Sequence, residues 1–484
     1  MKIAMITSES LPFSKTGGLG DVVFPLSKAL AMLNHDVKLF IPSLKGNITK
    51  ETRFLCAIKN DENILANLYE FQPISELPKF KIYLIEEETL ITQKKVYGEN
   101  NKAYPYNASR FALFSRLVLQ AMIQEEWIPD IINAHDWATA LTVAYIKYQP
   151  FSTHFKKTKS VFTIHNLGYQ GIFWLRTFHA THLPSQAICY NDKDKTQINF
   201  MATALTHADK ITTVSPTYAK EILIKENSLQ LAPLLSQREG ELVGILNGID
   251  NDNWNPDNDP YIAKNYNVKK QDGKQRCKKE FLKEIGLKDH TKPLVVMISR
   301  LAYQKGIDTL FGAPNCIEKI LQNLNINMVV VGTGEDWCEK RLEELTKKYD
   351  CFKGIKDFSE ALSHKVEAAG DFFLMPSIYE PCGLNQMYSS LYGTIPIVRN
   401  TGGLADTVIA LKSISYSHID EIIATGYSFD DLSCDAIYNT LAWALLVKQE
   451  HPQIHKKMIQ NAMCKDFSWH KSASEYESIY KQII

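Results

Sequence analysis

The chain is 484 residues long, too long for a single hydrophobic core, so we expect about two or three domains. Its 54 basic and 54 acidic residues cancel, which excludes the basic excess of a nucleic-acid-binding protein. The 45% hydrophobic content is that of a globular protein, and no apolar run approaches the ~20 residues that span a membrane. The opening sequence MKIAMITSES lacks the apolar core and cleavage site of a signal peptide. We therefore expect a cytoplasmic protein with no membrane or nucleic-acid partner.

The first recognisable unit is a strand, a glycine-rich loop, a helix and a second strand, over residues 2–41. The loop, residues 14–21, reads SKTGGLGD and matches neither G-x-G-x-x-G nor a Walker loop. Its glycines let a ligand approach the backbone, and Lys15 at its mouth can face an anion. The alternative is a tight turn with a solvated lysine.

Strands and helices continue to alternate through the first half of the chain. Residues 46–90 are expected to form strands and loops, and the later elements are strands 131–133, 160–164 and 210–215 and helices 108–124, 138–147 and 217–224. His135 and Asp136 follow one strand, and His165 ends the next. These side chains have the right types for a metal, but no third or fourth ligand at convergent spacing is evident. Neutral polar groups beside aromatic residues suit a sugar better.

A polar, proline-containing linker separates the halves. Asn247-Gly248 is a turn pair, and we place a hinge at residues 243–250. The predicted domains are residues 1–243, residues 244–460, and a C-terminal helix within 461–484 that packs back on the first domain. Two D-x-D triplets in the linker, at 250–252 and 257–259, are interpreted as turn formers rather than metal ligands.

The second half again alternates strands and helices. Strand 293–299 is followed by Arg300 and Lys305, which flank one strand-to-helix turn. Two cations in this place form a clamp suited to a diphosphate leaving group. The alternative, solvated basic residues at a helix start, runs against the preference of helix N-termini for acids.

Residues 371–408 contain two strand–loop–helix units in tandem. Strands 372–375 and 395–398 are each followed by a loop and a helix, the first helix spanning about 384–392. One loop carries Glu380, and the other is the glycine turn Thr401-Gly402-Gly403 at a helix start, which suits a phosphate. Ligands of open α/β sheets bind at the carboxyl ends of strands, so a sugar-nucleotide or sugar-phosphate site is plausible. The alternative is a solvated glutamate with ordinary turn glycines.

The nine cysteines are scattered and include no C-x-x-C pair. Such spacing indicates neither a disulfide framework nor a zinc site, so we expect mostly buried thiols. Cys382 is the exception, because it lies beside Glu380, where its backbone is expected to matter.

Taken together, these segments resemble the bacterial glycogen synthases. The matching segments are SKTGGLGDV at 14–22, HDW at 135–137, TIHNLGYQG at 163–171, ADKITTVSPTYAKEI at 208–222, GILNGID at 244–250, SRLAYQKGID at 299–308, FLMPSIYEPCGLNQ at 373–386, GTIPIVRNTGGLADTV at 393–408 and FSW at 467–469. The resemblance covers nearly the whole chain. It implies an α/β protein of two facing Rossmann-like domains of the GT-B type, with a cleft between them that closes about the hinge.

The resemblance also implies an activity, which is retaining transfer of glucose from ADP-glucose to the 4-OH of an α-1,4-glucan, without a metal or cofactor. Arg300 and Lys305 would bind the diphosphate, His165 would contact the transferred glucose, and Glu380 would lie at the reaction centre. The substrate-binding residues that it implies are Lys15, Gly18, Asp21, Asp136, Asn247, Cys382, Gly383, Leu384, Thr401, Gly402 and Gly403.

The sequence departs from the family pattern at 199–204, which lacks an expected lysine and glycines, and at 227–235, which lacks a glycine-rich stretch. Both departures concern the acceptor side. They leave open a glucan-binding pseudo-enzyme. Two further alternatives are a UDP-glucose enzyme and a phosphorylase, which would need a pyridoxal phosphate lysine.

Overall fold

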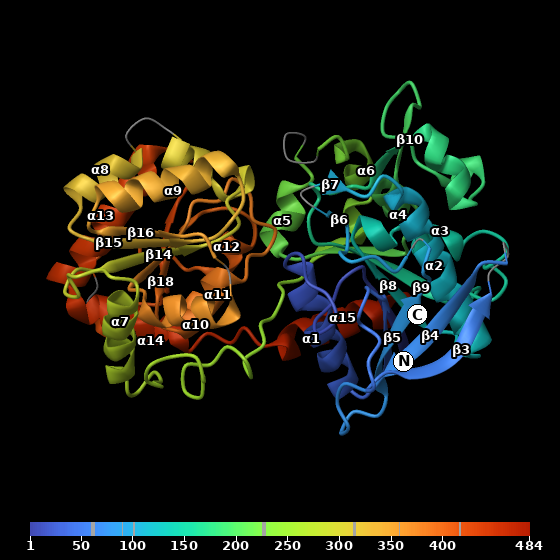
Figure 1. Cartoon of the computed structure of the whole chain (residues 1–484), viewed down its shortest axis with the longest axis horizontal. Helices are drawn as coiled ribbons and strands as arrows, with labels where there is room; N and C mark the ends of the chain where they lie inside the picture. The colour runs from blue at the N-terminus through green and yellow to red at the C-terminus, as the bar shows by residue number, and fades with distance from the viewer. Residues whose placement is uncertain are drawn as a thin grey trace. The chain divides into compact units, whose positions relative to one another are not determined.

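The structure, a computed structural model, describes residues 1–59, 63–89, 91–99, 102–224, 229–312, 316–357, 359–415 and 418–484. The chain forms two compact units: unit 1 is Met1–Gly248 with Trp469–Ile484, and unit 2 is Ile249–Ser468. The chain thus leaves unit 1 after residue 248, not 243, and returns after residue 468, not 460. Both termini belong to unit 1 (Figure 1).

Within the described residues, unit 1 is built on a nine-stranded sheet in the order β13-β12-β9-β8-β1-β2-β5-β4-β3. Its strands are β1 Lys2–Ile6, β2 Asp36–Pro42, β3 Arg53–Lys59, β4 Leu65–Phe71, β5 Phe80–Glu86, β8 Ile131–His135, β9 Lys159–Ile164, β12 Lys210–Thr213 and β13 Leu242–Gly244. All neighbours pair in parallel except β5-β4 and β4-β3, which are antiparallel. The parallel strands at the centre of the sheet, β1, β2 and β5, are mostly apolar and buried because helices cover both faces of the sheet.

The helices of unit 1 lie on both sides of this sheet (Figure 1). They are α1 Leu19–Met32, α2 Asn107–Gln124, α3 Leu141–Tyr145, α4 Phe200–His207, α5 Pro216–Glu221, α6 Ala232–Gln237 and α15 Trp469–Ile483. The C-terminal helix α15 packs against α1 and contributes Trp469, Tyr476 and Tyr480 to the hydrophobic core beneath β1. Apolar side chains of α1 at helical spacing, Val22, Leu26 and others, fill the same core.

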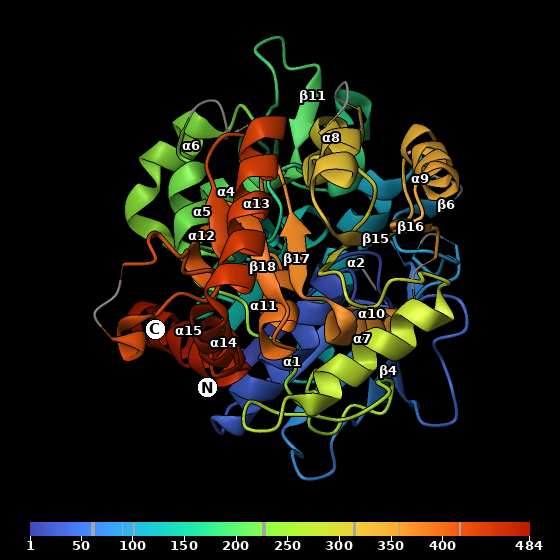
Figure 2. The same cartoon turned by 90° about the vertical axis from the view of Figure 1, so that its left-hand side faces the viewer.

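Unit 2 has a six-stranded parallel sheet in its described residues, in the order β16-β15-β14-β17-β18-β19. Its strands are β14 Leu294–Ile298, β15 Asn327–Val331, β16 Phe352–Ile355, β17 Phe372–Met375, β18 Ile395–Arg399 and β19 Tyr427–Phe429. Its helices are α7 Asp272–Glu284, α8 Cys316–Asn323, α9 Asp336–Lys348, α10 Glu360–Ala369, α11 Asn385–Leu391, α12 Gly402–Thr407, α13 Cys434–Glu450 and α14 Pro452–Met463. In Figure 2, where unit 2 faces the viewer, β17 and β18 lie side by side next to α11.

The pleat of β14 explains how unit 2 builds cores on both faces of its sheet. Val295 and Met297 join the core under α8 and α9, whereas Val296 and Ile298 join the core under α7 and α10. Successive side chains of a strand point to opposite faces, so an unbroken apolar strand requires helices on both.

The parallel part of the unit 1 sheet and the whole unit 2 sheet share the strand order of doubly wound folds, in which the direction of winding reverses beside the first strand. In unit 1 this switch point lies between β1 and β8, and in unit 2 it lies between β14 and β17. Ligands of such sheets bind outside the carboxyl ends of the strands at the switch point. The loops after these four strands are therefore the places to look for a site.

One local prediction from the sequence is wrong. The helix expected at 138–147 is a short turn, Trp137–Thr139, followed by the five-residue helix α3. The D-x-D triplets do form turns, since Asp250 Oδ1 accepts from the N–H of Asp252 at 3.0 Å and Asp259 Oδ1 accepts from the N–H of Tyr261 at 2.8 Å. Asp259 is in addition buried, and its carboxylate contacts His364 Nδ1 at 2.7 Å and also bonds Tyr392. None of the helices in the described part of the chain has the length and hydrophobicity to cross a membrane.

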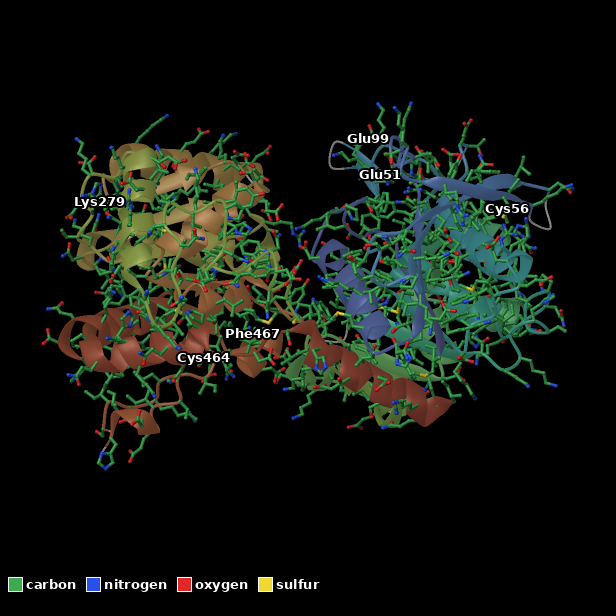
Figure 3. The ribbon with its side chains drawn as sticks, turned by 90° about the horizontal axis from the view of Figure 1, so that it is seen from below. Glu51, Cys56, Glu99, Lys279, Cys464 and Phe467 are labelled. Atoms are coloured by element: carbon green, nitrogen blue, oxygen red, sulfur yellow. A yellow bond between two sulfur atoms is a disulfide. The ribbon has the colours of Figure 1, made fainter. Side chains whose placement is uncertain are left out.

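The cysteine prediction also needs correction. Cys316 and Cys434, at the first residues of α8 and α13, form a disulfide, because the fold brings together positions 118 residues apart. Of the free cysteines, Cys277, Cys338 and Cys382 are buried, whereas Cys464 is exposed (Figure 3).

Candidate active site

Glu380 is the central side chain of the unit 2 site. It lies in the loop after β17, and its side chain is buried, with a residue exposure of 6%. Its Oε2 accepts hydrogen bonds from Lys305 Nζ at 2.5 Å and from Ser377 Oγ at 3.1 Å. Lys305 follows β14, so the two sides of the switch point supply the two members of this ion pair. Burial and pairing exclude a freely solvated glutamate.

The loop that carries Glu380 is tied to both neighbouring strand ends. The carbonyl of Gln304 accepts from the N–H of Ile378 at 2.8 Å, and Gln304 Nε2 donates to the carbonyl of Tyr379 at 3.2 Å. Arg399, at the end of β18, donates to the carbonyl of Ile378. These bonds restrict the path of the loop and thereby the position of the carboxylate.

Arg300 differs from Lys305, although the sequence placed both in one clamp. Its residue is exposed at the end of β14, and its guanidinium forms no ion pair or hydrogen bond with any described residue. A planar guanidinium with free donors is suited to a phosphate in two-point contact. The structure thus provides one cation held by Glu380 and one cation open to a ligand.

The glycine turn contacts the Glu380 loop directly. The N–H of Gly403, in the first turn of α12, donates to the carbonyl of Glu380 at 3.0 Å. A Cβ on Gly403 would lie 2.1 Å from the carbonyl oxygen of Cys382, so only glycine permits this approach. The Gly403 N–H is therefore engaged within the protein in this structure.

The remaining predicted positions of unit 2 surround this contact. Thr401 is a buried residue immediately before α12, and Gly402 has φ +46°. Gly383 has φ +71°, and Leu384 precedes α11. The structure therefore brings Cys382, Gly383, Leu384, Thr401 and Gly402 close to Glu380 in one loop cluster.

In unit 1 the glycine loop after β1 presents Lys15. The Lys15 Nζ pairs with Asp21 Oδ1 at 2.7 Å, and both side chains are partly exposed. The stem of Lys15 packs on Gly20, where a Cβ would lie 3.1 Å from its Cα, Cβ and Cγ atoms. Gly18 precedes α1 and has open space beside its Cα. Two of the predicted residues, Lys15 and Asp21, are thus direct partners.

Glu9 was not predicted, yet it organises the same loop. It is 3% exposed, and its Oε2 accepts hydrogen bonds from the backbone N–H groups of Thr16 and Gly17, the latter at 3.3 Å. Burial raises the pKa of Glu9 from its ordinary 4.5 to about 7, against the lowering effect of those two hydrogen bonds.

His165 and His135 form a buried pair at the ends of β9 and β8. His165 Nε2 lies 2.9 Å from His135 Nδ1. Burial lowers the pKa of His165 to about 3, and burial together with the neighbouring ring lowers that of His135 well below its usual range. Both imidazoles are therefore neutral near pH 7, which suits hydrogen bonding to a sugar hydroxyl.

Asp136 lies between the strand ends of β8 and β9. Its Oδ1 accepts from the N–H groups of His165 at 2.7 Å and Asn166 at 3.4 Å. Burial, with a smaller contribution from the nearby charge of Glu9, raises the pKa of Asp136 from 3.8 to about 7 against the lowering effect of those two hydrogen bonds. Its φ of +57° is unusual for aspartate, and strained residues of this kind cluster at functional sites.

Asn247, the last predicted residue of unit 1, is buried just before the chain leaves the unit. Its Oδ1 is inaccessible and accepts no hydrogen bond from the described residues. An amide oxygen in this state is costly unless a partner arrives. The neighbouring Gly248 must be glycine, because a Cβ there would lie 2.7 Å from the backbone of Trp469.

The two departures from the family pattern have different outcomes. Residues 200–204 are buried in α4, and Asn199 caps this helix by accepting from the N–H of Ala202 at 2.9 Å. This segment is therefore core, where a lysine would need a buried partner. The segment 227–235 lies partly outside the described residues, and its described part includes the start of α6.

Within the described ranges, no cluster of three or more His, Cys, Asp or Glu side chains could hold a metal ion.

The sequence did not predict Glu9 and Ser377, nor Tyr97, whose hydroxyl bonds Ser8 at 2.7 Å beside Glu9. A signal for Glu9 existed: like Glu380, it is a lone carboxylate just after a buried parallel strand. Nothing local indicates Tyr97, which follows no parallel strand.

Comparison with known proteins settles the family. The profile of the "Starch synthase catalytic domain" matches residues 2–237, and that of "Glycosyl transferases group 1" matches residues 278–463. Glycogen synthase of Treponema denticola is 41% identical over 100% of this chain and 99% of its own length. Glycogen synthase of Myxococcus xanthus is 38% identical over 100% of both chains. This chain belongs to the glycogen synthase family. It is a glycosyltransferase, as the resemblance implied.

Solved structures agree with this membership. The catalytic domain of Starch Synthase IV from Arabidopsis thaliana, bound to ADP and acarbose, matches with a TM-score of 0.87 and 29% identity over 99% of both chains. Sucrose-phosphate synthase from Thermosynechococcus elongatus matches with a TM-score of 0.62 and 17% identity, over 100% of this chain and 98% of its own, which supports the fold alone. The predicted GT-B fold class is confirmed.

Proposed function

We propose that this chain transfers glucose, with retention, from ADP-glucose to the 4-OH at the non-reducing end of an α-1,4-glucan. The observation that carries the proposal is the Glu380–Lys305 ion pair beside Arg300 at the switch point of unit 2. The relatives named glycogen synthase and the ADP-bound starch synthase structure support this choice of acceptor and donor.

The departing group of a nucleotide sugar is a diphosphate, so cations must stabilise the charge that develops on it. Arg300 is exposed with all its donors open, and Lys305 lies on the same strand-to-helix loop. We assign Arg300 and Lys305 to the diphosphate. Thr401 and Gly402, at the start of α12, are assigned to the same ligand.

Glu380 is assigned to the positive charge that develops at the anomeric carbon. Its Oε2 is engaged by Lys305 and Ser377, which lowers its power as a nucleophile. A front-face transfer needs no nucleophilic carboxylate. The bond from the anomeric carbon to the phosphate oxygen breaks with its electron pair on the diphosphate, the acceptor 4-oxygen bonds the same carbon, and its proton passes to the departing phosphate.

The side chains of unit 1 are assigned to hydroxyl groups and to the anion. His165 is neutral, so it can donate to or accept from a sugar hydroxyl without competing for the phosphate proton. Asp136 and Asn247 offer acceptor oxygens, and Lys15 offers the exposed cation of the glycine loop. Asp21, paired with Lys15, holds that ammonium near the loop.

The proposal is tested by incorporation of labelled glucose into glycogen, with ADP-glucose and UDP-glucose assayed side by side. We expect transfer from ADP-glucose to be faster. Arg300→Ala and Lys305→Ala should each cost roughly 2–4 kcal/mol of transition-state stabilisation. Lys279→Ala serves as the matched control, because Lys279 is an exposed lysine of α7 in unit 2 (Figure 3).

Three results would contradict the proposal. Glucan binding without incorporation from either donor would indicate a pseudo-enzyme. Faster transfer from UDP-glucose would overturn the assignment of ADP-glucose as the donor. A loss in the Arg300 and Lys305 variants that is confined to acceptor affinity would remove their role on the leaving group.

A further inference from the structure

The backbone of the glycine loop after β1 is held by a carboxylate of the protein itself. Consecutive N–H groups, those of Thr16 and Gly17, both point at Oε2 of Glu9. Two adjacent amides aimed at one oxygen form the kind of nest that binds an anion. Here the anion comes from the segment just after β1, so the nest is filled within unit 1 and is not left for a phosphate.

This arrangement is costly to the fold. Glu9 is 3% exposed, and no ion pair joins its carboxylate to a described lysine or arginine. Burial of a carboxylate without a paired cation destabilises a protein, and the raised pKa of Glu9 reflects that cost. A neutral residue at position 9 would make the fold more stable. The benefit that Glu9 provides in return is the fixed position of the loop.

Lys15 immediately precedes these two amides in the chain, so the position of its backbone depends on them. Three contacts fix Lys15: Glu9 holds the backbone of the next two residues, Asp21 pairs with its ammonium at 2.7 Å, and Gly20 packs on its stem. A side chain with four rotatable bonds needs such restraint before it can hold its charge at one place.

We propose that Glu9 is a positioning residue, whose carboxylate oxygen fixes the loop at residues 15–17 so that the Lys15 ammonium is preorganised for the nucleotide-sugar reaction. The inference rests on the proposed function, which assigns Lys15 to the substrate. Glu9 acts through the position of its oxygen, which has to reach both backbone amides. The negative charge of the carboxylate is not required.

Substitutions at Glu9 separate geometry from charge. Glu9→Gln keeps an oxygen at the same reach but carries no charge. Glu9→Asp keeps the charge but withdraws the oxygens by one methylene. Glu9→Met keeps the volume and has no oxygen. We expect kcat/KM within about threefold of wild type for Gln, and losses of roughly 10- to 100-fold for Asp and Met.

A double-mutant cycle then tests whether Glu9 acts through Lys15. The four proteins are wild type, Glu9→Met, Lys15→Gln and the double variant, assayed for kcat and for the KM of the donor. If Glu9 acts by placing Lys15, removing it from the Lys15→Gln background should cost less than about threefold. If Glu9→Met does not fold, Glu9→Asp takes its place in the cycle.

Glu87 provides a matched control within unit 1. It is 5% exposed and accepts hydrogen bonds from the backbone N–H groups of Thr89 and Ile91, each at 3.1 Å, so it anchors its own loop in the same way. Glu87→Met should lower the melting temperature and leave kcat/KM of the folded protein within about threefold of wild type.

Several outcomes would overturn the inference. If Glu9→Gln is as defective as Glu9→Met, charge rather than position is required, and Glu9 acts on the substrate itself. If the losses of Glu9→Met and Lys15→Gln multiply, the two residues act independently. If Glu87→Met loses as much kcat/KM, the effect is general destabilisation. Failure of the proposed function is separate, since wild type would then not transfer glucose at all.

Discussion

Glu380 in unit 2 is held in a different way from Glu9 and Asp136 in unit 1. In unit 2, Glu380 pairs with Lys305, and Asp371 pairs with Lys278 at 2.7 Å. Burial opposes ionisation of Asp371, but the charges of Lys448 and Lys278 outweigh it and lower the pKa of Asp371. In unit 1, Glu9 and Asp136 receive backbone N–H groups, and burial raises the pKa of each to about 7. The unit 1 site therefore contains groups that titrate near neutral pH, at the expense of stability.

Asp136→Asn tests that cost. The folded-state pKa of Asp136 is raised above its ordinary 3.8, so between about pH 4 and pH 7 the native protein keeps a proton that the unfolded chain has lost. The unfolding free energy of wild type consequently falls as pH rises through this window. We expect Asp136→Asn to be more stable than wild type by roughly 2–4 kcal/mol at pH 8, and by less at pH 5. Urea unfolding at the two pH values measures this.

The control for that experiment is Asp209→Asn, for which we expect a change in stability of the opposite sign. Burial opposes ionisation of Asp209, but hydrogen bonds from Lys147 and Ser160 outweigh it and lower its pKa. Its stabilisation is present above its unfolded pKa and is lost as pH falls through the folded value. Asp209→Asn should therefore be less stable than wild type at pH 8. A pH-independent gain for Asp136→Asn would contradict the assignment of its titration.

At the scale of elements, the contact between the Glu380 loop and the first turn of α12 links two adjacent strand ends. The Gly403 N–H bonds the carbonyl of Glu380, and its Cα lies against Cys382. The turn TGG thus does two things: it starts a helix, and it allows the loop of the neighbouring strand to lie directly on that helix.

Gly403→Ala should separate these elements. A methyl group 2.1 Å from the Cys382 carbonyl oxygen forces the loop to move, so we expect a loss of roughly 100-fold in kcat and about 1–3 kcal/mol in stability. Gly240→Ala is the control, since a Cβ there meets no atom within 4 Å. Transfer rates and urea unfolding measure both effects. An active Gly403→Ala enzyme would show that the loop position is not critical.

At the scale of the whole molecule, the last helix completes a unit that the first strand begins. Tyr480 of α15 is fully buried and donates to Asn133 Oδ1 of β8 at 2.6 Å, and Ser472 donates to the carbonyl of Leu246 at 2.6 Å. Residues more than 200 positions apart in sequence therefore share one core. Unit 1 cannot complete its core until the C-terminal segment is present.

Tyr480→Phe should destabilise unit 1 selectively, because it leaves the buried Asn133 oxygen without a donor, at a cost of about 1–3 kcal/mol. Tyr427→Phe is the matched control in unit 2: its hydroxyl is buried and has no partner among the described residues, so its removal should be neutral or stabilising. Hydrogen exchange of peptides from the two units measures in which unit the protection of backbone amides decreases. Equal loss of protection in both units for Tyr480→Phe would contradict this.

Much of the fold can be predicted from local pattern. Buried parallel strands are short apolar runs, and the predicted strand 372–375 matches β17 to the residue. Loops after such strands could be identified as site loops, which is how Glu380 and Arg300 were found. The predicted helix at 138–147 is wrong because its apolar residues suit either a turn buried in the core or a helix. Periodicity alone does not distinguish these two structures.

The sequence by itself determined the strand–loop–helix units and the chemical types at their loops, since both depend on residues close together along the chain. Tertiary structure alone decided which of these groups meet. Strand order brings Lys305 to Glu380 across 75 positions, and the fold buries Asp259 against His364. It also turns the loop after β1 back onto Glu9. Each of these outcomes depends on the path of the backbone and on burial, which no local pattern of residues specifies.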